Sequence, residues 1–164
     1  MADINQAIQR VIRLEDESLS GKIATDEGGV TKWGIASKYN PGVDVANLTL
    51  EQAKKIYAEK YATPFHLQDI SDQDVQDRVL DCVVNPGQDE GSKLVQQAIN
   101  RIRPGSVAED GCIGPETVSR INALAPDELI PHIRACRVLF YFNDVQKNPD
   151  RLPYLFGWLV RACR

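Results

Sequence analysis

Residues 14–35 read LEDESLSGKIATDEGGVTKWGI, a stretch that combines a helix end, a polar turn and a pair of glycines. Just upstream, Ile8, Val11 and Ile12 recur at the three- and four-residue spacing of one helix face. Glu15 continues that face, at a position where an apolar residue would be expected. Because a carboxylate that faces a core is costly unless it is paired or protonated, Glu15 needs an explanation beyond helix formation.

Apolar residues recur at helical spacing through most of the chain, and turn residues separate these segments. A capping box, Thr-Leu-Glu-Gln at residues 49–52, opens a helix that ends at Pro64. The sequence therefore predicts a mainly α protein with at most a small β-hairpin near residues 20–30. The other predicted helices are residues 3–17, 31–39, 72–85, 89–102, 115–124, 126–146 and 150–162.

Length, charge and hydropathy exclude several classes of protein. The 164 residues are enough for one compact domain with its own core. The net charge is −4 and the basic residues are scattered, which argues against nucleic-acid binding. No run of apolar residues is long enough for stable membrane insertion. The first residues, MADINQAIQRVIRL, lack the layout of a signal peptide, so we expect synthesis in the cytoplasm.

The cysteines and histidines do not form a metal-binding pattern. They are widely spaced and include no CxxC pair, so we expect neither a metal nor an organic cofactor. The spacing favours buried free thiols, and the alternative is one or two disulfides formed in an oxidising compartment. The residues concerned are Cys82, Cys112, Cys136, Cys163, His66 and His132.

A carboxyl group at the position of Glu15 has two interpretations. Burial raises the pKa of a carboxyl group, and a carboxyl that keeps its proton can act as a general acid on a glycosidic oxygen. The alternative is a structural glutamate paired with an arginine or capping a loop amide. The residues that follow Glu15 favour the first interpretation, because they supply the other groups that a sugar site needs.

Those residues begin eleven positions after Glu15, beyond the polar turn. Asp26 and the hydroxyl of Thr31 could hold an attacking water or stabilise a cationic transition state. The glycines permit close approach of the backbone to a ligand, and aromatic rings offer faces on which sugars stack. Asn85, before a Pro-Gly turn, either ends a helix or lines the substrate cleft. The predicted substrate-binding residues are Gly28, Gly29, Trp33, Tyr39 and Asn85.

The segment LED…DEGGVTKWGIASKY resembles the signature of glycoside hydrolase family 108, whose members are lysozyme-like N-acetylmuramidases and phage-type endolysins. Four later segments are similar to the peptidoglycan-binding region that accompanies this family: DCVVNPG at 81–87, LVQQAIN at 94–100, DGCIGPET at 110–117 and GWLVR at 157–161. The resemblance implies a lysozyme-like helical fold. It also implies a single compact domain, 1–164, with a catalytic muramidase lobe at 1–85 and a helical peptidoglycan-binding lobe at 86–164.

The family's catalytic acid is usually followed by two glycines and lies about nine residues before the aspartate. Here Glu15 is followed by Asp16, and Glu17 is the residue nine positions before Asp26. We prefer Glu15 as the acid because it continues the face of Val11 toward the core, which requires a two-residue insertion in the turn. The resemblance then implies Glu15 as the catalytic acid with Asp26 and Thr31 in support, and Glu17 as the second choice.

The implied activity is hydrolysis of the β-1,4 bond between N-acetylmuramic acid and N-acetylglucosamine, with peptidoglycan glycan strands as the partner. We expect a monomer that reaches the periplasm or wall through a holin or a secretion machine. One alternative is a non-catalytic peptidoglycan-binding protein, which the unusual residues after Glu15 favour. Another is a helical interaction protein in which Glu15 is a paired structural acid.

Two later motifs also bear on the site. Asp110 opens the loop DGCIG and is expected to order it by accepting backbone N–H bonds, as a short polar side chain does in turns. Trp158 is either a core anchor or part of a wall-binding surface, with Arg161 as an ionic neighbour.

Overall fold

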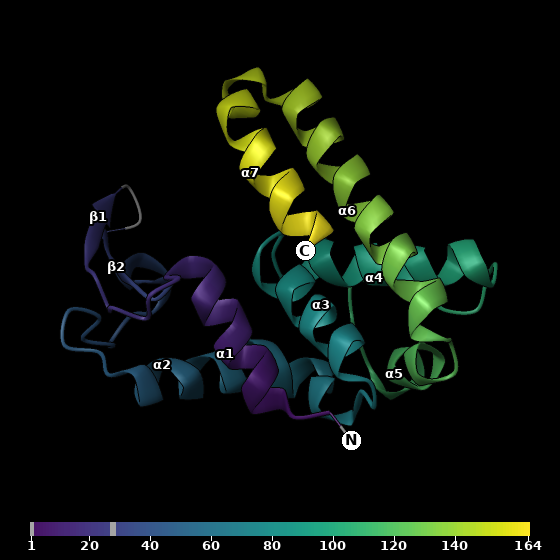
Figure 1. Ribbon diagram of the computed structural model, residues 1–164, viewed down its shortest axis with the longest axis horizontal. Coiled ribbons are helices and arrows are strands. Elements are labelled where there is room, and N and C mark those ends of the chain that lie inside the picture. Colours follow the sequence, from purple (N-terminus) through teal and green to yellow (C-terminus); the bar gives the residue numbers. More distant parts are fainter. Residues whose placement is uncertain (1, 27–28) are drawn as a thin grey trace.

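The computed structural model describes residues 2–26 and 29–164, with the backbone alone at Asp26. It confirms a mainly α protein, with a small sheet at one end of a helical body (Figure 1). The described α-helices are α1 (Ile4–Glu15), α2 (Leu50–Tyr57), α3 (Gln73–Val84), α4 (Gln88–Ile102), α5 (Pro115–Asn122), α6 (Pro126–Lys147) and α7 (Leu152–Cys163). Short 3-10 or π segments lie at Ser37–Tyr39, Ala58–Ala62, Thr63–Phe65, Leu67–Asp69 and Pro149–Arg151.

A side chain caps the first turn of helix α1, and a backbone hydrogen bond from Asp16 to Ile12 closes its last turn. The Asp3 carboxylate accepts a bond of 2.9 Å from the N–H of Asn5, one of the donors that the first turn leaves free. At the other end Asp16 leaves the helix with extended backbone angles and accepts a bond of 2.7 Å from the N–H of Gly21. The helix therefore stops at Glu15, two residues before the predicted end. Its buried face is Ala7, Ile8, Val11 and Ile12.

The expected hairpin is part of a three-stranded antiparallel sheet with the order β1 (Ala24–Asp26), β2 (Gly29–Lys32) and β3 (Ile35–Ala36). Ala24 is paired with Thr31, and Thr31 is paired in turn with Ala36. The central strand β2 therefore has a partner on both sides, one strand more than a hairpin provides.

The predicted helix over residues 31–39 is wrong. Trp33 and Gly34 have φ angles of 50° and 76°, and two consecutive left-handed residues form the tight turn between β2 and β3. A helix needs φ near −63°, so this pair interrupts any helix across the segment. The buried hydroxyl of Tyr57 donates a bond of 3.0 Å to the carbonyl of Trp33 and ties the turn to α2.

The predicted capping box of α2 is confirmed. The N–H of Gln52 donates to the Thr49 hydroxyl at 3.2 Å, and the Gln52 side chain accepts from the N–H of Thr49 at 2.8 Å. After α2 the chain continues as a π-helical turn, Ala58–Ala62, before Pro64 ends helical structure at a 3-10 turn. This arrangement places Tyr57, the last residue of α2, and Tyr61, in the π-helical turn, close to the end of α1.

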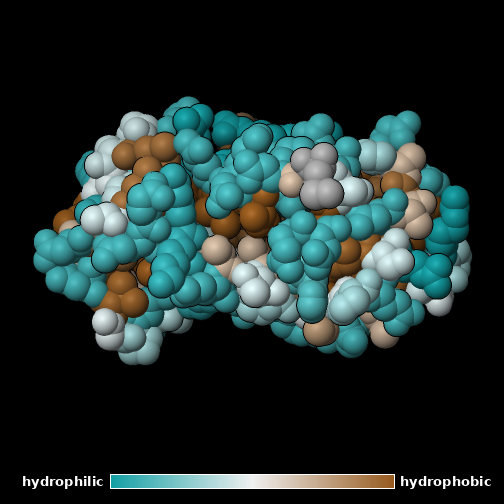
Figure 2. All heavy atoms as spheres, turned by 90° about the horizontal axis from the view of Figure 1, so that it is seen from below, coloured by the Kyte–Doolittle hydropathy of each residue, from teal (hydrophilic) through white to brown (hydrophobic). Residues whose placement is uncertain are grey.

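A single apolar core runs from α1 through α3 and α4 to α6. Helix α3 packs against both α1 and α4, and α4 packs against α6. Helix α7 packs mainly on α6, and the two form a hairpin that rises from the body (Figure 1). Seen from below, the surface is largely hydrophilic, with apolar residues in separate patches (Figure 2). Within residues 2–26 and 29–164, no helix has the length and apolar character needed to cross a membrane.

All four cysteines are free thiols, as the spacing favoured. Their burial differs from the prediction, because only Cys82 and Cys136 are buried, while Cys112 and Cys163 are exposed.

Candidate active site

Glu15 is the last residue of α1, where the buried face of the helix reaches the surface. The residue as a whole is exposed, but its side chain, at the edge of the core, is only 27% exposed. Oε1 accepts a hydrogen bond of 2.7 Å from the guanidinium of Arg161 in α7. The structure thus brings the first and last helices of the chain together at this carboxylate.

The turn between β2 and β3 closes over Glu15. A Cβ atom at Gly34 would lie 2.7 Å from Cγ of Glu15 and 2.6 Å from the hydroxyl oxygen of Tyr57. Gly34 also has a positive φ of 76°. Only glycine meets both conditions without strain, so Gly34 sets the distance between the sheet and the acid. Sequence analysis missed this residue, although the Trp-Gly-Ile segment after a strand was a usable signal.

Two tyrosines form the other wall around Glu15. The rings of Tyr57 and Tyr61 have centroids 5.5 Å apart. Burial raises the pKa of both hydroxyls, and the negative charge of Glu15 raises each further. Both tyrosines are therefore neutral at neutral pH, and the Tyr57 hydroxyl donates its hydrogen bond to the carbonyl of Trp33.

Behind Arg161 lies a buried carboxylate, Asp81 of α3. Oδ1 of Asp81 accepts bonds from Nε of Arg161 at 2.9 Å and from a terminal nitrogen of the same guanidinium at 2.7 Å. Oδ2 accepts from Arg137 of α6 at 2.7 Å, and the Asp81 and Arg137 side chains are 8% and 3% exposed. Such charge-assisted, paired contacts fix the guanidinium of Arg161 in one plane.

The same network reaches Asn85, which the sequence analysis placed in the substrate site. Arg137 donates to the hydroxyl of Tyr141 at 3.2 Å, and that hydroxyl donates to the side-chain oxygen of Asn85. Asn85 also caps the end of α3. The tyrosine ring stacks on Trp158 with centroids 5.2 Å apart, which leaves Trp158 half-buried in the α6–α7 hairpin. These contacts occupy the amide oxygen of Asn85.

The sheet brings together the positions of Asp26 and Thr31. Asp26 is opposite Gly29, and Thr31 is opposite Ala24, so the two positions are diagonal neighbours in the β1–β2 pair. The side chain of Asp26 lies outside the described part of the chain. The hydroxyl of Thr31 is buried and has no hydrogen-bond partner among the described residues. A buried hydroxyl without a hydrogen-bond partner is unusual in a folded protein.

The predicted substrate-binding residues differ in accessibility. Gly28 lies outside the described residues. Gly29 has φ of 82° and packs against the Ser37 hydroxyl, with no room for a side chain. Trp33 is 8% exposed and belongs to the core, whereas Tyr39 is 64% exposed. Of the two predicted aromatic residues, Tyr39 is therefore the one with a face open to a sugar ring.

Glu17 lies in the turn after α1, and it is exposed. Within residues 2–26 and 29–164 its side chain makes no hydrogen bond or ion pair. Asp16 has a structural role, because desolvation is outweighed by hydrogen bonds from Gly21 and Ser20 and the pKa of its carboxyl is lowered. Of Glu15, Asp16 and Glu17, Glu15 is the one that forms an ion pair with another described residue.

The prediction for Asp110 is confirmed. Its carboxylate accepts a bond of 2.9 Å from the N–H of Cys112 and one of 2.8 Å from the amide of Gln96. Gln96 is 1% exposed, and its oxygen accepts from the N–H of Gly111 at 3.0 Å. The buried glutamine was missed by sequence analysis. Among the described residues, no group of three or more His, Cys, Asp or Glu side chains could hold a metal ion.

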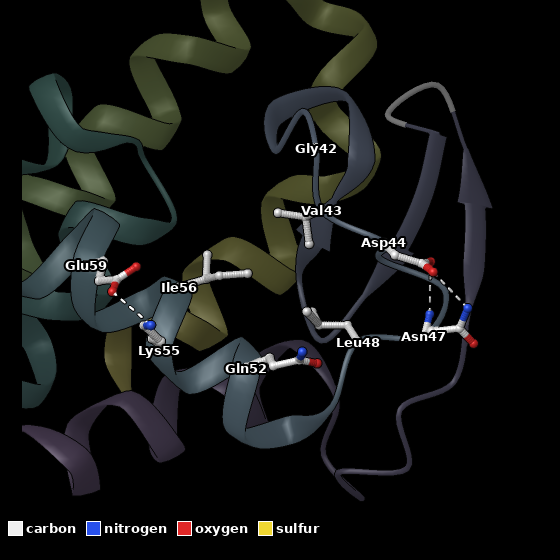
Figure 3. Close-up of a pocket in the computed structure, with 9 residues that line it drawn as sticks. All are labelled: Gly42, Val43, Asp44, Asn47, Leu48, Gln52, Lys55, Ile56 and Glu59. Carbon is white, nitrogen blue, oxygen red and sulfur yellow. Dashed lines mark hydrogen bonds and ion pairs between the residues drawn. The ribbon is translucent and has the colours of Figure 1, made fainter.

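A separate cavity of about 490 Å³ lies between residues 42–48 and α2 (Figure 3). Its apolar lining is Val43, Leu48 and Ile56. The polar groups at its edge are already paired, Asp44 with Asn47 and Lys55 with Glu59. It contains none of the predicted site residues.

Two protein-family models match successive parts of the chain. Residues 11–87 match the family described as Glycosyl hydrolase 108, and residues 90–163 match the family described as Predicted Peptidoglycan domain. These matches support a glycosidase that acts on peptidoglycan. The chain thus has two successive segments that match these families, and they meet next to Pro86-Gly87. We refer to residues 11–87 as the glycosyl hydrolase segment and to residues 90–163 as the peptidoglycan-domain segment.

The fold is similar to that of Brucella abortus SagA. The two structures have a TM-score of 0.65 at 23% sequence identity, over 96% of this chain and 92% of that chain. No curated protein sequence matches the chain.

Proposed function

We propose that the protein is an N-acetylmuramidase of the lysozyme type, which cleaves the β-1,4 bond between N-acetylmuramic acid and N-acetylglucosamine. The observation that carries the proposal is that Glu15 packs against Gly34 of the β2–β3 turn and binds Arg161 near the end of α7. Glycosidases of this type need a carboxyl group beside the scissile bond and further polar groups a short distance away.

Glu15 acts as the general acid in this proposal. Of the two carboxyl oxygens of Glu15, Oε1 accepts a bond from Arg161, and Oε2 has no hydrogen-bond partner within the described residues. The second oxygen can therefore carry the proton and give it to the leaving glycosidic oxygen, while the first stays bound to the arginine. The oxygen atom of the broken bond gains the proton, and water completes the hydrolysis at the sugar's anomeric carbon.

Asp26 and Thr31 support the reaction from the sheet. Their neighbouring positions in β1 and β2, together with the unpartnered hydroxyl of Thr31, suit residues that hold the attacking water or stabilise the oxocarbenium-like transition state. Tyr39, with its exposed ring, is the proposed stacking surface for a sugar. The enzyme would work in the periplasm or wall, as a monomer carried there by a holin or a secretion machine.

The test measures reducing-sugar release and turbidity loss from purified peptidoglycan, for wild type, Glu15→Gln and Glu17→Gln. We expect wild type and Glu17→Gln to be active and Glu15→Gln to lose at least about 100-fold, the usual contribution of a general acid. Loss in Glu17→Gln alone would assign the acid to Glu17 and leave Glu15 a structural role. Circular dichroism melts of all three proteins control for folding.

A second candidate function is peptidoglycan binding without catalysis. The ion pair between Glu15 and Arg161 favours it, because a structural glutamate would be held in the same way. In that case the wild type would sediment with peptidoglycan and release no reducing ends, and Glu15→Gln would bind equally well.

A further inference from the structure

Arg161 belongs to the peptidoglycan-domain segment, and Glu15 belongs to the glycosyl hydrolase segment, 146 residues away along the chain. Helix α7 touches the first half of the molecule near its C-terminal end, where Arg161 is only 14% exposed. A single guanidinium therefore connects the candidate acid with the second segment.

The guanidinium of Arg161 is oriented before it reaches Glu15. Two of its nitrogens donate to Oδ1 of Asp81, and the third donates to Oε1 of Glu15 at 2.7 Å. Asp81 is fixed in turn by Arg137 through its other oxygen. Because the arginine fork is planar and rigid, fixing two nitrogens determines the direction of the third.

The charge of Arg161 is secure. Burial by itself would lower the pKa of the guanidinium, but the charges of Asp81 and Glu15 outweigh it and raise that pKa. Tyr57 and Tyr61 also lie near Glu15, whose charge adds to the effect of burial in raising the pKa of both hydroxyls. Arg161 is thus the cation that the described surroundings offer to the Glu15 carboxylate.

Glu15 needs such a partner because it ends a helix. The next residue, Asp16, has already left the helix with φ −142° and ψ 93°. A glutamate side chain has three rotatable bonds, and at a helix end few neighbours restrict them. Gly34 packs against Cγ, but the bond from Arg161 is what orients the carboxyl group itself. A general acid must lie within hydrogen-bond reach of the leaving oxygen, so its orientation enters the rate directly.

We infer that Arg161 is a positioning residue for Glu15, anchored by Asp81, so that the peptidoglycan-domain segment completes the active site of the glycosidase segment. This inference rests on the proposed function. A lysine cannot replace the arginine fully, since its single nitrogen cannot bridge Asp81 and Glu15 with the same fork.

The experiment measures kcat and KM for reducing-end release from soluble peptidoglycan strands, in wild type, Arg161→Gln, Arg161→Lys and Arg151→Gln. Arg151 is the matched control, because it forms an exposed ion pair with Asp144 at the other end of α7. We expect Arg161→Gln to lower kcat about 10- to 100-fold with KM within about twofold, because the acid is misplaced and binding is not. Arg161→Lys should recover part of kcat, and Arg151→Gln should match wild type.

The inference is overturned if kcat of Arg161→Gln stays within about twofold of wild type, whether or not KM rises. If Arg161→Gln does not fold, Arg161→Lys, which keeps a positive charge beside Asp81, takes its place, and unchanged kcat in that protein overturns the inference equally. A wild type that releases no reducing ends overturns the proposed function and the inference with it. An active wild type, with Glu15→Gln inactive and Arg161→Gln at full kcat, overturns the inference alone.

Discussion

Asp81 and Asp110 are two carboxylates that the protein holds by different means. Asp81 is buried in α3 and accepts bonds from two arginines that lie 56 and 80 residues away along the chain. Asp110 is exposed in its loop and accepts bonds from Cys112, two residues away, and from Gln96, fourteen residues away. One site is assembled from distant helices and the other mainly from its own neighbourhood.

The difference lies in which parts of the molecule each carboxylate connects. Asp110 accepts bonds from its own loop and from Gln96 of α4, so the loss of its carboxylate should affect this region alone. The Asp81 cluster, which consists of Asp81, Arg137 and Arg161, orients the arginine that reaches Glu15. Its disruption should affect both global stability and the candidate site. The following predictions test that contrast, from the largest expected effect to the smallest.

Asp81→Asn should destabilise the protein by about 3–5 kcal/mol, because Arg137 is left as a buried charge without its counter-charge. Urea denaturation followed by circular dichroism gives the change in free energy of unfolding. The matched variant is Asp77→Asn, also in α3, which breaks an ion pair with Arg10 of α1. Because the Arg10 side chain is 45% exposed, this variant should lower the free energy of unfolding by less. Equal costs for the two variants would contradict the special role of Asp81.

Gly34→Ala should cost about 2–4 kcal/mol, the sum of left-handed strain and overpacking against Glu15 and Tyr57. Gly42 is the control, since it has φ of 85° and an added Cβ would have no neighbour within 4 Å. Gly42→Ala should therefore cost only the backbone strain, about 1–2 kcal/mol. Unfolding curves of both variants measure the difference, and a Gly34→Ala protein as stable as Gly42→Ala would rule out the close packing.

Asp110→Asn should have a smaller effect on stability than Asp81→Asn, and the effect should depend on pH. Hydrogen bonds from Gln96 and Cys112 lower the pKa of Asp110 below 3.8, its ordinary value. A carboxyl with a lowered pKa stabilises the folded state above its unfolded pKa, and the contribution is lost as pH falls through the folded value. The melting temperatures of wild type and variant should therefore differ at neutral pH and converge well below pH 3.8. A constant difference would contradict this linkage.

Each of the two sites has a neighbouring cysteine, and the two should react differently. Burial raises the pKa of Cys82, next to Asp81, to about 12, so little thiolate forms at neutral pH. Cys112, in the Asp110 loop, is exposed. Iodoacetamide labelling of the native protein, read by peptide mass mapping, should modify Cys112 and Cys163 quickly and Cys82 and Cys136 slowly. Fast labelling of Cys82 would show that the Asp81 cluster opens readily.

Helix positions could be predicted from sequence because each depends on a local pattern. The apolar spacing of α1, the Thr49 capping box and the Pro-Gly pair after Asn85 each lie within one or two helical turns. The loop at Asp110 was predictable for the same reason. The segment after Thr31 was not, because its helix-like spacing conflicted with a turn stabilised from outside by Tyr57.

In the candidate site, too, one part was predictable from the sequence and another part was not. The sequence by itself determined that Ile8, Val11 and Ile12 lie on the buried face of α1, because that face follows from helical periodicity. The end of the helix at Glu15, two residues earlier than predicted, came from the structure. Only the tertiary structure decided that Arg161 is the partner of Glu15, that Asp81 anchors it and that Trp33 is buried. These contacts join residues 24 to 146 positions apart, and local patterns carry no record of which distant surfaces pack together.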